Sequence, residues 1–422
     1  MEEKSVRIGH SSEARRALAL LLGLNLLCYL DRYILAAVEP EIRRAFFAAD
    51  DPDAMAKTGL LATAFLVSYM VLAPLFGWLA DRYSRWVIIA FGVTVWSLAT
   101  LGSGWATTFG LLVLARMFVG AGEAAYGPAS PTILADLFPK EKRGIVLAWF
   151  FAAIPVGSAL GYMFGGAMAA WQGWRAPFHY AAVPGLILAG LCLLFKDRKP
   201  STGAKRRHAT LADYLGLARI PSFVVNVGAQ TAMTFAIGGI SFWAPAYFHG
   251  TRGQPDLAQI NLIFGGITAV AGLTATLFGG WLGDRLAGKF PGAYFLVSGS
   301  GMLLAFPCTL AMLFVPFPLA WVFCFFAIFF LFMNIGPANT AIANVTSPAV
   351  RSTAFAVNIF VIHALGDAIS PPLIGVIADR SSLTVGFVVV SLAMLVAGLL
   401  WLYGARFLRH DEEKVGFQGE PG

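Results

Sequence analysis

Long apolar runs are the feature that most limits how this chain can fold. Repeated stretches of about 18 residues or more are apolar, and a run of that length can cross the hydrocarbon core of a bilayer as a helix. Inside lipid, every backbone polar group must be satisfied within the protein, so only helices and closed barrels span a membrane. Charged residues make up 13% of the sequence, whereas roughly a quarter is usual in a soluble domain. The unbroken runs therefore predict an all-α membrane protein.

The apolar runs predict twelve transmembrane helices. Their expected ranges are 17–38, 57–80, 86–106, 108–137, 142–170, 176–195, 220–248, 257–283, 292–315, 318–347, 350–378 and 384–408. An even number of spans puts both termini on one side of the membrane. About 22 of the 30 Lys and Arg residues fall on that side, which predicts cytoplasmic termini by the positive-inside rule. We expect a multi-pass protein of the plasma membrane, the inner membrane if the source is bacterial.

The chain reads as two related halves. Its longest polar stretch separates residues 1–195 from residues 220–422, and we interpret 196–219 as a cytoplasmic linker. The sequence Gly-Trp-Leu-Ala-Asp-Arg at 77–82 recurs with one change at 280–285, 203 positions later. The Gly-Pro-Ala sequence at 127–129 recurs at 336–338, 209 positions later. This near-constant offset predicts two pseudo-symmetric six-helix bundles, a parallel repeat found in many secondary transporters.

The repeated loop motif resembles that of the major facilitator superfamily. Where the family pattern has another glycine after the arginine, this chain has Ser84. The resemblance covers nearly the whole chain and implies the major facilitator fold, with a motif that gates one side of the protein. We assign the following residues to this gate motif: Gly77, Asp81, Arg82, Arg85, Gly280, Asp284 and Arg285. The alternative is that Asp81 and Arg82 only anchor helix ends at the lipid headgroups.

A narrower resemblance lies in three segments, Cys-Tyr-Leu-Asp-Arg-Tyr at 28–33, the stretch 120–139, and His-Ala-Leu-Gly-Asp-Ala at 363–368. These are similar to the spinster subfamily, whose animal members export sphingosine-1-phosphate or lysophospholipids. The resemblance implies a lysolipid or sphingoid phosphate as substrate. This resemblance is a weaker guide to the substrate than to the fold, because proteins of one fold move very different molecules.

Ionisable residues inside the predicted spans are the candidates for function. They are Asp31, Arg32, Arg116, Glu123, His363 and Asp367. Each costs several kcal/mol in the hydrocarbon core unless it is paired or hydrated. Asp31 and Arg116 fall roughly 6–10 Å below the outer edge of the core, and Glu123 lies near the midplane. Arg116 and Glu123 share a helix face, with Gly120 between them. The four residues of the first half are therefore expected to form one cluster.

The cluster suggests proton coupling. Desolvation favours a neutral carboxyl group and a neighbouring arginine favours the carboxylate, so the two effects compete. We expect Asp31 or Glu123 to bind and release a proton, while Arg32 and Arg116 hold an anionic headgroup or the free carboxylate. The alternative is a permanently ionised network that fixes helix packing. His363 and Asp367, spaced four apart, form a second pair for which coupling and structural hydrogen bonding both stay open.

The two halves differ in their polar residues. The spans of the second half that correspond to the first and fourth carry amides and no charge in their cores, which suits an amphiphile with its headgroup against the first half and its tail against the second. A lipid-facing surface rich in aromatic residues would have the same composition. Besides Arg32 and Arg116, we assign these residues to substrate binding: Tyr33, Tyr126, Asn226, Gln230, Asn334 and Asn339.

Other functional classes fit poorly. The connections are too short for a soluble catalytic domain, and the sequence has no phosphate-binding loop, nucleophile elbow or metal-ligand cluster, so we expect no enzyme, no metal and no cofactor. A net charge of +7 comes from basic residues scattered among helix ends, which argues against nucleic acid. The four cysteines lie within apolar runs and are interpreted as inert core residues: Cys28, Cys192, Cys308 and Cys324.

These observations predict a secondary active transporter that works by alternating access, and its buried carboxyl groups predict that transport is coupled to protons. Its expected partners are a small-molecule amphiphilic or anionic substrate, protons and membrane lipids, and we expect a monomer. The alternative is a facilitator, or a proton symporter for a small organic anion or sugar acid.

Overall fold

The computed structural model describes residues 12–197, 211–347 and 350–417. Within these ranges all regular secondary structure is helical. Eleven helical segments of the described residues are long and apolar enough to cross a membrane, and a shorter apolar helix, Ala176–Cys192, stands where the sixth span was predicted. The prediction of an all-α, multi-pass membrane protein is confirmed.

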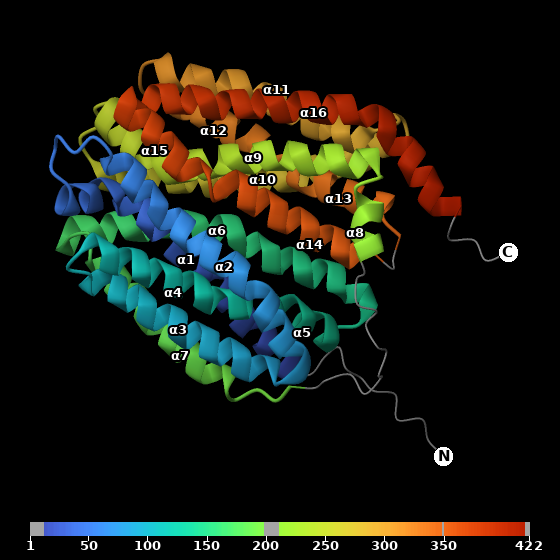
Figure 1. The fold of residues 1–422 in the computed structure, drawn as a ribbon, viewed down its shortest axis with the longest axis horizontal. Helices are drawn as coiled ribbons and strands as arrows, with labels where there is room; N and C mark the ends of the chain where they lie inside the picture. Colours follow the sequence, from blue (N-terminus) through green and yellow to red (C-terminus); the bar gives the residue numbers. More distant parts are fainter. Residues whose placement is uncertain (1–11, 198–210, 348–349, 418–422) are drawn as a thin grey trace. The chain divides into compact units, whose positions relative to one another are not determined.

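The chain packs as two compact units. Of the described residues, unit 1 takes in 12–49, 60–197 and 254–265. Its helices run from blue to green in Figure 1. They are α1 (Ser12–Phe46), α2 (Ala54–Arg82) beyond its first turns, α3 (Arg85–Trp105), α4 (Phe109–Tyr126), α5 (Ala129–Leu137), α6 (Lys140–Gln172) and α7 (Ala176–Cys192).

Of the described residues, unit 2 takes in 50–59, 211–253, 266–347 and 350–417. Its elements are α8 (Leu211–Leu217), α9 (Pro221–Ala246), the π-helical turn η1 (Tyr247–Thr251), α10 (Leu257–Ala287) beyond its first turns, α11 (Ala293–Phe314), α12 (Leu319–Phe332), α13 (Ile335–Val345), α14 (Arg351–Ile362), the π-helical turn η2 (His363–Asp367), α15 (Ser370–Arg380) and α16 (Leu383–Phe417). The first turn of α2 is held in this unit by Asp379, whose two carboxylate oxygens accept the amides of Met55 at 3.0 Å and Ala56 at 2.8 Å.

Two helices run well past their predicted ends. The first was expected to end at residue 38, yet α1 continues to Phe46, with an ion pair between Glu39 and Arg43 one turn apart. The last was expected to end at residue 408, yet α16 continues to Phe417, with Arg409 and Glu413 paired in the same way. Hydropathy marks only the apolar part of a helix, whereas pairs spaced four apart support its polar extension.

Each copy of the Gly-Pro-Ala repeat lies at a helix break. The first copy falls where α4 ends at Tyr126 and α5 begins at Ala129, and the second where α12 ends at Phe332 and α13 begins at Ile335. Proline has no amide hydrogen and its ring crowds the preceding turn, so a continuous helix is disfavoured at both places. The repeat seen in the sequence thus has a structural counterpart in each unit.

Small residues bring the helices of unit 1 close together. A Cβ atom added at Gly157 or Gly161 of α6 would meet the backbone oxygens of Leu26 or Leu30 in α1. One added at Gly120 of α4 would meet the backbone oxygen of Phe65 in α2. Backbones can approach this closely only where no side chain intervenes. These contacts position α1, α2 and α4, the three helices that carry most of the candidate site.

Candidate functional site

An ion pair between α1 and α4 forms the centre of the site in unit 1. The Glu123 side chain is fully buried, and its Oε2 atom lies 2.7 Å from Nη2 and 2.8 Å from Nε of Arg32. The other carboxylate oxygen, Oε1, is buried and has no hydrogen-bond partner among the described residues. The Arg32 side chain keeps 20% of its surface exposed. One partner of the pair is therefore sealed in the protein while the other is open on one side.

A second pair joins Asp31 and Arg116, which are each about 1% exposed. Asp31 Oδ2 lies 3.5 Å from Nη1 of Arg116 and accepts a hydrogen bond of 2.9 Å from the Thr100 hydroxyl of α3. The Nε atom of Arg116 has no hydrogen-bond partner in the described part of the chain. The predicted cluster exists, and it consists of a tight pair and a looser one.

Aromatic rings lie against both guanidinium groups, three at Arg32 and one at Arg116. The Arg32 guanidinium carbon lies 4.9 Å from the ring centre of Tyr29, 4.7 Å from that of Phe65 and 5.5 Å from that of Tyr69. The same Phe65 ring lies 5.3 Å from the guanidinium of Arg116. Ring faces attract cations most strongly where water is excluded. The rings therefore stabilise two arginines in a place where water is scarce.

Cys28 is a member of this cluster that sequence reasoning missed. Its buried thiol donates to Glu123 Oε2 over 3.0 Å. The sequence predicts Cys28 to be an inert core residue like the other cysteines, whereas its thiol contacts the central carboxylate. Its spacing from Asp31 and Arg32, close to one helical turn, is the signal that could have found it.

The two tyrosines predicted to bind substrate lie in different surroundings. Tyr126 is buried, and its hydroxyl donates to the backbone oxygen of Leu21 over 2.7 Å, which ties α4 to α1. Tyr33 is partly exposed and packs on Tyr162 with ring centres 5.1 Å apart. Tyr33 thus keeps surface for a ligand, while the hydroxyl of Tyr126 is engaged within the protein.

His363 and Asp367 form the predicted pair in unit 2. The imidazole Nδ1 lies 3.0 Å from both carboxylate oxygens, and both side chains are partly exposed. The two residues begin and end η2, where the helix widens into a π-helical turn. Such turns are rare and are often found at functional sites.

The amide residues of unit 2 are mostly engaged in helix packing. Asn226 donates to Ala338 and accepts from the Trp401 indole. Asn334 and Asn339 both donate to backbone oxygens of their own span. The amide group of Gln230 accepts from Asn358 over 3.3 Å, and this leaves Gln230 Nε2 buried without a partner in the described residues. Of these four amides, Gln230 is the one whose side-chain nitrogen has no hydrogen-bond partner in the described residues.

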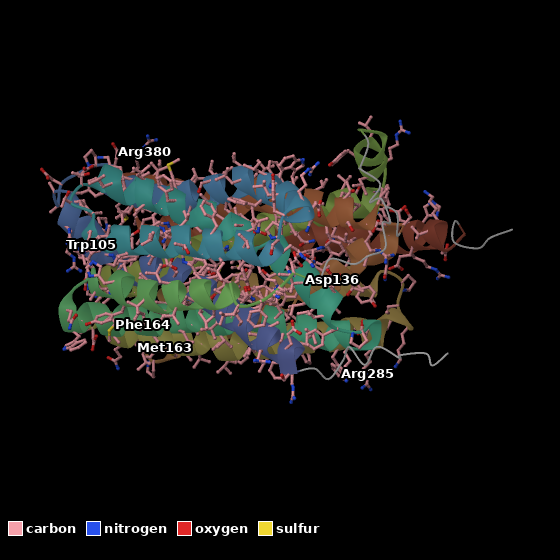
Figure 2. The ribbon with its side chains drawn as sticks, turned by 90° about the horizontal axis from the view of Figure 1, so that it is seen from below. Trp105, Asp136, Met163, Phe164, Arg285 and Arg380 are labelled. Carbon is pink, nitrogen blue, oxygen red and sulfur yellow. The ribbon has the colours of Figure 1, made fainter. Side chains whose placement is uncertain are left out.

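The gate motif of unit 1 includes a charged cluster around Arg85. This arginine binds Asp197 through two side-chain nitrogens and its backbone amide, and its Nη1 lies 2.6 Å from Asp136. Figure 2 places Asp136 and Trp105, the last residue of α3, toward opposite ends of the unit. Asp197 was missed because it falls in the stretch interpreted as a linker.

The remaining gate residues can be compared between the two copies of the motif, one in each unit. The guanidinium of Arg82 lies 3.9 Å from the Trp78 ring, and that of Arg285 lies 5.2 Å from the Trp281 ring. A Cβ atom added at Gly77 would lie 3.9 Å from Pro128. One added at Gly280 would meet nothing within 4 Å, whereas one added at Gly336 would lie 3.3 Å from the Gly280 Cα. Asp81 is exposed, and Asp284 accepts from the Tyr294 hydroxyl over 3.1 Å. The two copies of the motif thus have similar local structures.

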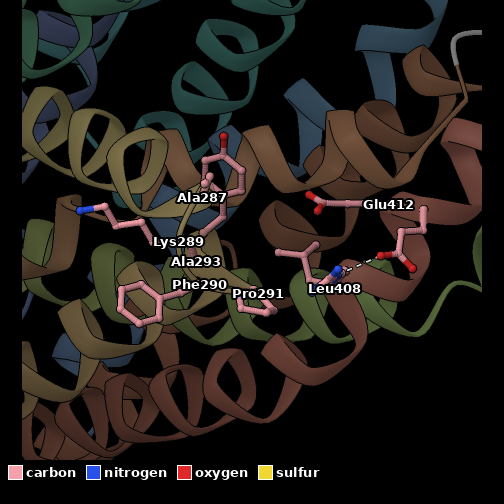
Figure 3. A pocket seen from close by; sticks show the side chains of 12 residues that line it. Ala287, Lys289, Phe290, Pro291, Ala293, Leu408 and Glu412 are labelled. Carbon is pink, nitrogen blue, oxygen red and sulfur yellow. Dashed lines mark hydrogen bonds and ion pairs between the residues drawn. The ribbon is translucent and has the colours of Figure 1, made fainter.

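A separate pocket of about 420 Å³ lies in unit 2, between the α10–α11 loop and the end of α16. Figure 3 shows Lys289 and Glu412 at its wall. Arg409 and Glu413, which also line it, form an ion pair at 2.9 Å. None of the predicted site residues lines it. Nowhere in the described ranges do three His, Cys, Asp or Glu side chains gather as they would around a metal ion.

Known proteins resemble this chain over nearly its whole length. Residues 21–371 match the family described as the Major Facilitator Superfamily. The chain is 38% identical over 409 residues to human "Protein spinster homolog 1", an overlap of 90% of this chain and 76% of that protein.

Two solved structures share the fold. A bacterial homolog to the human lysosomal transporter Spinster, in an inward-facing and unoccupied conformation, matches with a TM-score of 0.80 and 19% identity, over 98% of this chain and all of that one. A D-xylose-proton symporter matches with a TM-score of 0.72 and 20% identity, over 93% and 96% of the two chains. The predicted fold of two six-helix bundles is the fold of these proteins.

Proposed function

Because this chain belongs to the spinster branch of the major facilitator superfamily, we propose that it is a secondary active transporter in which proton binding at Glu123 drives substrate movement. Members of the family are membrane transporters, so the prediction that the chain is not an enzyme is confirmed. The observation that supports proton coupling is the buried Glu123 carboxylate, which has one oxygen bound to Arg32 and the other without a partner in the described residues.

The environment of Glu123 suits reversible protonation. Burial makes the charged form of a carboxyl group expensive, while the Arg32 guanidinium at 2.7 Å makes it favourable. A group held between these two effects can change its protonation state when either one changes. Rehydration of the site or movement of Arg32 during alternating access would each change which form of Glu123 is favoured. Coupling a proton to a conformational cycle requires such a change.

Arg32 connects the proton to the substrate. Its side chain is partly exposed, so an anionic group can approach the face of the guanidinium that Glu123 does not occupy. When Glu123 takes up a proton, Arg32 loses its anionic partner and the site gains a free positive charge. Protonation and anion binding then favour each other, as thermodynamic linkage requires. The substrate class that fits is an amphiphilic anion with a phosphate or carboxylate headgroup.

The remaining assignments complete the proposal. Asp31 with Arg116 is a second charged pair that supports the same cycle, and His363 with Asp367 is a second candidate proton site. The gate motif around Arg85 controls opening at one end of unit 1. The protein works as a monomer in the plasma membrane of its source, with cytoplasmic termini.

Transport by variants in proteoliposomes tests the proposal. The probe is a lysophosphatidic acid with a fluorescent acyl chain, and its accumulation is measured with and without an imposed pH gradient. Glu123→Gln should bind and exchange the probe yet fail to accumulate it, because the neutral amide cannot carry a proton. Asp31→Asn should resemble it if the two carboxyl groups act as one coupled system.

The matched control is Glu39→Gln, since Glu39 of α1 is also a buried glutamate but pairs with Arg43 outside the cluster. It should keep gradient-driven uptake. Full accumulation by Glu123→Gln would refute proton coupling at this residue. Wild-type uptake that ignores the pH gradient would favour a facilitator.

A further inference from the structure

The hydrogen bonds of Glu123 are distributed unevenly between its two oxygens. Oε2 accepts from Arg32 Nε at 2.8 Å, lies 2.7 Å from Arg32 Nη2 and accepts from the Cys28 thiol at 3.0 Å. Oε1 is equally buried, and no donor of the described residues reaches it. A carboxylate with free rotation would share its donors between both oxygens. Here Oε2 accepts from all of these donors, so the donor side chains hold the carboxylate in one orientation.

Arg32 and Cys28 fix that orientation from neighbouring turns of α1. The two residues are four positions apart in the helix, so their side chains reach the same oxygen from one face. The arginine supplies charge as well as hydrogen bonds. The thiol supplies a single weak donor and no charge. Its contribution is therefore mainly directional.

We propose that Cys28 is a positioning residue for proton transfer, which holds Glu123 Oε2 so that Oε1 is the atom that receives the proton. The inference rests on the proposed function, in which Glu123 carries the proton. On protonation, water that reaches the site gives up a proton and an O–H bond forms at Oε1, while Oε2 keeps Arg32 and Cys28 as donors. On release the same O–H bond breaks and the proton passes from Oε1 to water. The thiol keeps its own proton throughout.

Other ionisable groups also face Glu123. They are Arg32 and Asp31 of α1 and Tyr69 of α2, with Tyr29 and Tyr126 close to Cys28 and Arg116 paired with Asp31. Replacing Arg32, Asp31 or Arg116 changes the charge of the site. Replacing Cys28 removes one hydrogen bond and leaves the charge unchanged, so its effect reports on that hydrogen bond and not on a change of charge.

Infrared titration of the carboxyl group tests the proposal. The carbonyl band of protonated Glu123 is identified by its loss in Glu123→Gln and is followed against pH in the purified full-length protein. A hydrogen bond from the thiol stabilises the carboxylate more than the acid, so Cys28→Ala should move the midpoint toward higher pH by about 0.5–1 unit. Cys28→Ser keeps a donor and should titrate near the wild type.

The control is Cys192→Ala, which removes a buried cysteine of α7 in the same unit and should not move the midpoint. The thiol itself gives a second measurement that needs no stable alanine variant. Its S–H stretching band, identified by its loss in Cys28→Ser, should move to lower frequency when Glu123 ionises.

A midpoint that is the same in Cys28→Ala and the wild type, or an S–H band that ignores the titration of Glu123, would overturn the positioning role. Equal shifts in Cys28→Ser and Cys28→Ala would also overturn it, because the cause would then be packing. If Glu123→Gln instead keeps gradient-driven accumulation, the proposed function itself fails, whatever Cys28 does.

Discussion

Replacing Asp31 and Arg116, first one at a time and then both together, tests whether this ion pair has a functional or only a structural role. Arg116→Met removes the guanidinium and leaves the Asp31 carboxylate buried with the Thr100 hydroxyl. Asp31→Asn with Arg116→Met removes both charges and keeps similar volumes. If the pair serves only helix packing, the double variant should recover both stability and coupled transport. If it serves the proton cycle, stability should recover and coupling should not.

The structure sets the size of the single-variant effect. At 3.5 Å and an effective dielectric constant of about 20, two unit charges attract by about 4–5 kcal/mol. Breaking a buried pair typically costs about 3–5 kcal/mol, because the remaining charge stays buried alone. The long separation and the unpartnered Nε of Arg116 favour the lower end of that range. Arg116→Met should therefore lose about 3 kcal/mol of stability.

Two assays on the same preparations decide the question. Thermal unfolding in detergent gives the stability of the wild type, both single variants and the double variant, and the double-mutant cycle isolates the pair. Uptake of the fluorescent lysophosphatidic acid under a pH gradient gives coupling. Arg116→Lys serves as the matched control for charge, since an ammonium keeps the charge but loses the planar guanidinium. A double variant with wild-type stability and full gradient-driven uptake would refute a role for this pair in transport.

Two further predictions concern packing and substrate. Gly120→Ala should destabilise the protein by about 1–3 kcal/mol, since the added Cβ meets the Phe65 backbone of α2. Gly110→Ala in the same helix is the control and should be tolerated, because its added Cβ meets nothing within 4 Å. Equal melting temperatures for the two variants would contradict the close approach of α4 to α2. Lysophosphatidic acids of increasing chain length should compete for binding more strongly, by up to about 0.8 kcal/mol for each added methylene. Affinity that ignores chain length would argue for a compact anion.

Hydropathy predicted the helices well because a bilayer leaves few alternatives. The ends were less predictable, since the polar extensions of α1 and α16 depend on local ion pairs and not on hydrophobicity. The repeat was visible in the sequence, and the helix breaks at both Gly-Pro-Ala copies follow from proline chemistry. Local and solvent-driven features were therefore accessible from sequence alone.

The partners within the charged cluster were not accessible in this way. Sequence placed Asp31, Arg32, Arg116 and Glu123 near one another but could not say which arginine meets which carboxylate. Adjacent positions on a helix point about 100° apart, so Asp31 and Arg32 turn to different neighbours. Asp31 meets Arg116 and Thr100, while Arg32 meets Glu123. That choice depends on the packing of α3 and α4 around α1, which no local pattern encodes.

The way unit 1 is packed supports a functional reading of its buried charges. Close contacts between α1 and α6 and between α2 and α4 are made at Gly157, Gly161 and Gly120, where backbones approach directly. Small residues are the usual means of helix association in lipid, and at these three positions the helices meet without any charge. Ions buried at several kcal/mol each are a cost that these contacts do not carry. They are also incompletely satisfied, since Glu123 Oε1 and Arg116 Nε lack partners among the described residues. A network selected only for stability would have satisfied or replaced these atoms, whereas a site that must exchange a proton and an anion needs them available.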